Sequence, residues 1–146
     1  MEFGLLFLPA ALFPAIPLMM INYANRYSSL SALIRKIHDE LIEKKPTQRE
    51  KDTKRYIDQI VILRKRLKLN RTFQTLGAIS FFVNLISIFF GYKLISNNTS
   101  IYFEPLFIYT FLLGLLIFSA SIALFIYELQ LSVAALNKHL EDIEEL

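Results

Sequence analysis

The sequence predicts an all-α integral membrane protein with three transmembrane helices and a cytoplasmic three-helix bundle that resembles a coiled coil. Apolar residues make up 54% of its 146 residues and gather in three blocks that carry almost no charge. Between and after these blocks, apolar residues recur at alternating spacings of four and three, as in a heptad repeat. Basic residues gather almost entirely in the gap between the first two blocks. This composition excludes a disordered chain and an ordinary soluble domain.

The three apolar blocks cover about residues 3–22, 72–92 and 105–127 of a single membrane domain, residues 1–146. A hydrocarbon core about 30 Å thick requires about 20 apolar residues in a helix, so each block is long enough to span it. Backbone groups in lipid must be satisfied internally, which makes each block a helix. The start, Met1-Glu2, lacks the basic region of a signal peptide, so we expect the first block to remain as a span.

The orientation follows from the basic residues. The segment 22–71 holds 14 of the 16 Lys and Arg residues and six acids, which leaves a charge of +8. The positive-inside rule places this segment in the cytoplasm, the N-terminus outside and the C-terminus inside a cell inner (plasma) membrane. Tyrosines are expected at both interfaces: Tyr23, Tyr27 and Tyr127 at the inner one, and Tyr92 and Tyr102 at the outer one. Anionic lipid head groups are the expected partner of the basic segment, and nucleic acid is not.

The cytoplasmic segment 23–71 is expected to form an antiparallel helical hairpin. Its first arm carries apolar residues at spacings of 4, 3, 4, 3 and 4, and its second arm at spacings of 4, 3 and 4. We call each such row an apolar seam: Tyr23, Tyr27, Leu30, Ile34, Ile37 and Leu41 in the first arm, and Tyr56, Ile60, Leu63 and Leu67 in the second. Pro46 is expected to separate the arms, and residues 47–50 read as a capping box.

The third span is expected to continue as one helix through residues 128–146, called the extension here. No Gly or Pro interrupts residues 115–146, and a third apolar seam follows the span: Leu129, Val133, Leu136, Leu140 and Ile143. Three seams of similar length predict one three-helix bundle. Residues 129–146 contain one base and four acids, a charge of −3, so we expect their acidic end to dock near the basic hairpin turn at Lys44, Lys45, Arg49 and Lys51.

The second span carries its small and polar residues on one face, at spacings of 3, 4, 3 and 4. This polar stripe consists of Gly77, Ser80, Asn84, Ser87 and Gly91. Small residues let helices approach closely, and hydroxyl or amide groups can hydrogen-bond across the contact. The stripe is therefore a candidate helix-packing surface or, alternatively, a candidate pore lining.

Three prolines, Pro9, Pro14 and Pro17, interrupt the first span. Each lacks an N–H donor, and its ring clashes with the carbonyl four residues back. The alternatives are a kinked or partly unwound helix that lines a polar path, and a packing kink against the other spans.

A ring of polar residues lies at the predicted inner boundary of the spans: Asn22, Asn25, Arg26, Arg71, Gln74, Glu128 and Gln130. It predicts either a pore mouth or hydrogen-bonded collar, or a plain interfacial band. No Asp, Glu, Lys, Arg or His lies inside a span, which disfavours proton-coupled transport.

Catalysis is not expected. The chain has no cysteine, no glycine-rich phosphate loop and no nucleophile motif, and its two histidines, His38 and His139, show no metal-ligand spacing. We therefore expect no catalytic residue, no metal and no cofactor.

Several stretches resemble the bacterial membrane family catalogued as domain of unknown function 2721. They are residues 9–16 and 23–26, residues 63–67 and 74–80, and residues 128–133, 135–137 and 139–140. The resemblance implies a three-span topology, and it implies no activity because the family has none established. The order span, hairpin, span, span is also similar to that of YidC-type and Get-type insertases.

Two functions remain in competition. The first is a homo-oligomer that forms an ion-conducting channel or pore, since three spans are too few to enclose a path alone. The second is a scaffold, adaptor or insertase-like protein that docks a partner through its cytoplasmic helices.

Overall fold

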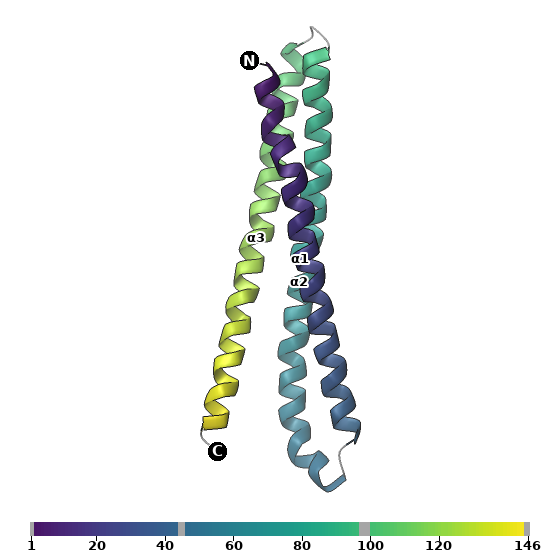
Figure 1. The fold of residues 1–146 in the computed structure, drawn as a ribbon, viewed down its shortest axis with the longest axis vertical. Helices are drawn as coiled ribbons and strands as arrows, with labels where there is room; N and C mark the ends of the chain where they lie inside the picture. The colour runs from purple at the N-terminus through teal and green to yellow at the C-terminus, as the bar shows by residue number, and fades with distance from the viewer. Residues whose placement is uncertain (1, 44–45, 97–99, 145–146) are drawn as a thin grey trace.

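The computed structural model describes residues 2–43, 46–96 and 100–144, and every residue in these ranges is helical (Figure 1). Helix α1 is Glu2–Glu43, α2 is Pro46–Ser96 and α3 is Ser100–Glu144. α2 runs in the opposite direction to α1 and α3. All three helices are long and apolar enough to cross a membrane, which confirms the three predicted spans.

Each helix is much longer than its span. The helices contain 42, 51 and 45 residues. At 1.5 Å per residue these lengths correspond to about 63, 77 and 68 Å, against a hydrocarbon core of about 30 Å. α1 and α2 therefore run from span to hairpin without a break. α1 also continues through Pro9, Pro14 and Pro17, so the partly unwound form considered from the sequence is absent from residues 2–43.

The two hairpin arms pack on each other through their predicted seams. Leu30, Ile37 and Leu63 are buried and form one apolar core. Partly buried neighbours surround this core: Ile34, Tyr56, Ile60 and Leu67. The spacings of four and three place these residues on the facing sides of α1 and α2.

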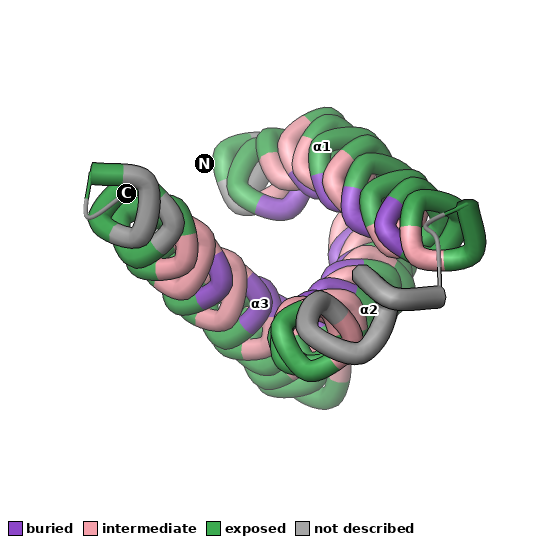
Figure 2. The backbone as a smooth tube through the Cα atoms, turned by 90° about the horizontal axis from the view of Figure 1, so that it is seen from below, coloured by how far each residue is buried: buried purple, intermediate pink, exposed green. Residues whose placement is uncertain are grey.

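The third predicted seam does not join this core. α2 packs against both α1 and α3, whereas the C-terminal end of α3 lies apart from the hairpin (Figures 1 and 2). Val133, Leu136 and Leu140 consequently remain 58%, 58% and 50% exposed. The packing of α3 along the α2 span sets its direction, and an uninterrupted helix bends only gently from there. The predicted docking of acids on Lys44, Lys45, Arg49 and Lys51 lies outside the described side chains.

Candidate functional site

The polar stripe of α2 is buried inside the chain. All five of its residues are buried. The Ser80 and Ser87 hydroxyls donate to the carbonyl oxygens of Gly114 and Phe107 on α3, at 2.8 and 3.4 Å. The Asn84 amide nitrogen donates to the carbonyl oxygen of Pro9 on α1, at 2.9 Å. The stripe therefore packs α2 against both neighbouring helices.

A glycine permits a close approach at one end of this contact, whereas the glycine at the other end leaves room for a Cβ atom. A Cβ atom built on Gly91 would lie 2.6 Å from a methyl carbon of Leu6 and 2.9 Å from the Phe107 ring. One built on Gly77 would lie 3.5 Å from the Tyr23 ring. A side chain at position 91 would require the Leu6 methyl group and the Phe107 ring to move, so this close approach favours glycine, as helix contacts in membranes do.

An aromatic cluster follows the stripe toward the hairpin. The Tyr23 ring lies 4.6 Å from the Phe73 ring and 5.2 Å from the Phe125 ring, measured between centroids. Ser121 donates to the Phe73 carbonyl at 2.7 Å. Since a hydroxyl carries one hydrogen, the Tyr23 hydroxyl must donate to Ser121 across their 3.3 Å contact. Tyr23 is fully buried, so it does not belong to the interfacial tyrosines predicted from the sequence.

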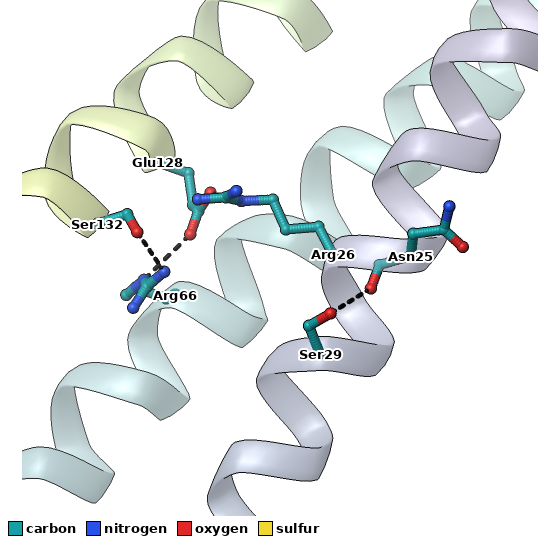
Figure 3. Close-up of polar contacts among 6 residues, drawn as sticks. All are labelled: Asn25, Arg26, Ser29, Arg66, Glu128 and Ser132. Atoms are coloured by element: carbon teal, nitrogen blue, oxygen red, sulfur yellow. Dashed lines mark hydrogen bonds and ion pairs between the residues drawn. The ribbon is translucent and has the colours of Figure 1, made fainter.

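One carboxylate joins all three helices just beyond the spans (Figure 3). Glu128 of α3 is fully buried; its Oε2 accepts from Nε of Arg26 on α1, and its Oε1 accepts from Nε of Arg66 on α2 at 3.0 Å. Nη2 of Arg66 also donates to the Ser132 hydroxyl at 2.9 Å. We call these four residues the ion cluster. Hydrogen bonds between charged groups are the strong ones, and burial makes them costly to break.

The ion cluster uses only part of the predicted polar ring. Arg26 and Glu128 come together, whereas the other predicted members do not join them. Gln74 is half-buried, and four are exposed: Asn22, Asn25, Arg71 and Gln130. Figure 3 shows the Asn25 amide pointing away from the cluster. The ring is therefore not one continuous collar in this chain.

Arg66 and Ser132 were not predicted. Arg66 lies three residues after Leu63, so it faces the same side of α2 as the apolar seam, and Ser132 lies one turn after Glu128. The sequence signal that could have identified Arg66 is a charged residue on the apolar face of its helix. Its partner was not visible, because pairing between distant segments requires the register of α2 against α3.

The family-model comparison covers this whole region. A model described as "Protein of unknown function (DUF2721)" matches residues 6–138. The chain belongs to the DUF2721 family. The matched range includes the polar stripe, the aromatic cluster and the ion cluster. No curated protein and no solved structure matches the chain.

The family match and the three long apolar helices together identify a membrane protein. Within the residues described, no group of three or more His, Cys, Asp or Glu residues gathers as a metal site would require. A shallow hollow of about 380 Å³ lies on α3. Its lining consists of Ile126, Leu129, Gln130, Val133, Ala134 and Asn137.

Two buried amides of this DUF2721 protein are incompletely bonded. Neither polar atom of the Asn70 side chain has a partner, and Oδ1 of Asn84 has none either, among the residues the structure describes. Asn70 lies between Arg66 and Phe73 on the inner face of α2, so it separates the ion cluster from the aromatic cluster. Buried polar groups usually find a partner, often an ordered water.

Proposed function

We propose that this protein is a non-enzymatic, homo-oligomeric membrane scaffold, in which the extension of one copy docks on the hairpin of another at the cytoplasmic face. One observation carries the proposal. Val133, Leu136 and Leu140 form an apolar row on α3 beyond the third span, and half or more of each side chain is exposed. Contiguous exposed apolar surface outside the lipid is typical of a protein interaction site.

A second copy is the occupant that the chain itself supports. Residues 129–146 carry a charge of −3, and residues 22–71 carry +8, so two copies attract each other through these segments. The hairpin offers exposed apolar residues outside its own core: Leu33, Ile42, Ile57 and Val61. The C-terminal end of α3 in the same chain lies apart from the hairpin (Figure 1).

The burial of the polar stripe favours this scaffold over a pore. A conducting assembly built on the stripe would need Ser80, Asn84 and Ser87 to face a shared lumen. In the single chain these three side chains donate to backbone carbonyls of α1 and α3. Exposing them to a lumen would require breaking those bonds in an apolar medium, where each is expensive to lose.

The test is the oligomeric state of a double variant. We expect the purified protein in detergent to be oligomeric, and Val133→Gln with Leu136→Gln to make it monomeric, because the apolar contact is lost. The matched control is Lys138→Gln, since position 138 lies about 200° around the helix from Leu136. Native mass spectrometry measures all three.

Three results would contradict the scaffold. A monomeric parent protein at micromolar concentration would remove the self-assembly, and so would a double variant that keeps the parent mass. Ion flux across the membrane of liposomes that contain the parent protein would favour the channel over the scaffold.

A further inference from the structure

The ion cluster carries more positive than negative charge. The guanidinium groups of Arg26 and Arg66 share the single carboxylate of Glu128, which leaves one positive charge over. The arginine side chains are only 25% and 12% exposed, and Glu128 is fully buried. A surplus charge that is largely removed from water is costly unless an anion neutralises it.

The two arginines also have donors to spare. Within the described part of the chain, Glu128 and Ser132 are the side chains that accept from them. Each guanidinium presents five N–H donors in a planar fork, more than one carboxylate and one hydroxyl can accept. The fork geometry matches a phosphate group, which can accept two parallel hydrogen bonds from one arginine.

Glu128 and Arg26 lie at the depth of the lipid head groups, and Arg66, which lies just beyond that depth, reaches Glu128 with its side chain. Glu128, Arg26 and Arg66 lie one, four and six residues beyond the predicted spans, or about 1.5, 6 and 9 Å along a helix. The polar layer on each side of the hydrocarbon core is roughly 5–7 Å thick. The exposed part of Arg26 therefore lies where head groups lie. Asn22, exposed and one turn nearer the span, adds an amide donor on the same face of α1.

We propose that Arg26 and Arg66 bind the phosphate group of one anionic phospholipid, with Asn22 as a further donor. Arg26 bridges α1 to α3 through Glu128, so the bound head group lies at the junction of these helices (Figure 3). The net charge of +1 selects a lipid with net charge −1 over a zwitterionic one. The site is independent of the proposed oligomer, because one chain supplies all its residues.

The experiment counts bound lipid by native mass spectrometry of the purified full chain. Phosphatidylglycerol, phosphatidylcholine and inorganic phosphate are added separately. We expect the parent chain to hold one phosphatidylglycerol tightly. Arg26→Gln should retain the lipid at least about tenfold more weakly, because it loses a charge-assisted hydrogen bond to the phosphate. Arg26→Gln leaves the Arg66–Glu128 pair in place, and its melting curve checks that it folds.

The matched control is Arg71→Gln, which removes an exposed arginine at the same boundary, outside the cluster. It should retain the lipid as the parent does. Equal retention by Arg26→Gln and Arg71→Gln would overturn the proposal, as would equal retention of phosphatidylcholine. Displacement of the lipid by millimolar inorganic phosphate would overturn a lipid as the ligand.

Discussion

Among the described residues, Glu128 is a fully buried acid. The two arginines that bind its carboxylate differ in exposure and in hydrogen bonding. The Arg66 side chain is nearly buried and donates to both Glu128 and Ser132. The Arg26 side chain is twice as exposed and donates to Glu128 alone. Removing the carboxylate would leave two guanidiniums facing each other in a partly buried site. Removing Arg26 would leave one neutral ion pair. The two losses should therefore differ greatly.

We expect Glu128→Gln to lower the free energy of unfolding by about 3–5 kcal/mol, the cost of breaking a buried pair. Arg26→Gln should cost about 1 kcal/mol or less, as partly exposed ion pairs do. Denaturant unfolding in detergent at pH 7 measures both. The double variant should recover part of the Glu128→Gln loss, because the repulsion between guanidiniums is gone. Equal losses for the two single variants would contradict the predicted difference between the carboxylate and Arg26.

At the scale of the elements, the three seams look alike in sequence, but only two of them pack together. The α1 and α2 seams face each other and bury Leu30, Ile37 and Leu63. The α3 seam has the same spacing, but the C-terminal end of its helix lies apart from the hairpin (Figures 1 and 2). Leu63 and Leu136 are thus matched leucines in opposite environments, one buried and one exposed.

Leu63→Ala should lower the free energy of unfolding by about 2–4 kcal/mol, because it creates a cavity in the hairpin core. Leu136→Ala should change it by less than about 0.5 kcal/mol in the dissociated chain, as exposed positions do. Both are measured by thermal unfolding at a protein concentration low enough to prevent assembly. A large loss for Leu136→Ala under these conditions would mean that the extension packs within its own chain.

At the scale of the whole molecule, the helices form a long rod, and the spans predicted from the sequence lie toward one end of it (Figure 1). α2 alone is about 77 Å long, and its predicted span begins near residue 72, so about half of the helix extends beyond that span. At the opposite end, α1 begins at Glu2, one residue before its span. The end beyond the predicted spans carries the +8 segment, and the positive-inside rule predicts that this end lies in the cytoplasm.

Single cysteines test this orientation, and the natural chain contains none that would need removal. A maleimide that cannot cross membranes should label Tyr102→Cys in intact cells, because this exposed residue lies at the outer end of α3. Glu40→Cys and Glu141→Cys, also exposed, should react only after lysis. The cysteine-free parent is the control for background. Labelling of Glu40→Cys in intact cells would reverse the orientation.

The sequence by itself determined the three spans, the helical hairpin seam and the family, because apolar length and heptad spacing are local properties. It also marked the polar stripe, Arg26 and Glu128 as unusual residues. Only the tertiary structure decided that the stripe is buried against α1 and α3, that Arg66 and Ser132 complete the ion cluster, and that Val133 and Leu136 stay exposed. These outcomes depend on the register and direction of helices distant in sequence. One-dimensional spacing identifies a contact face, but it does not identify the helix that covers it.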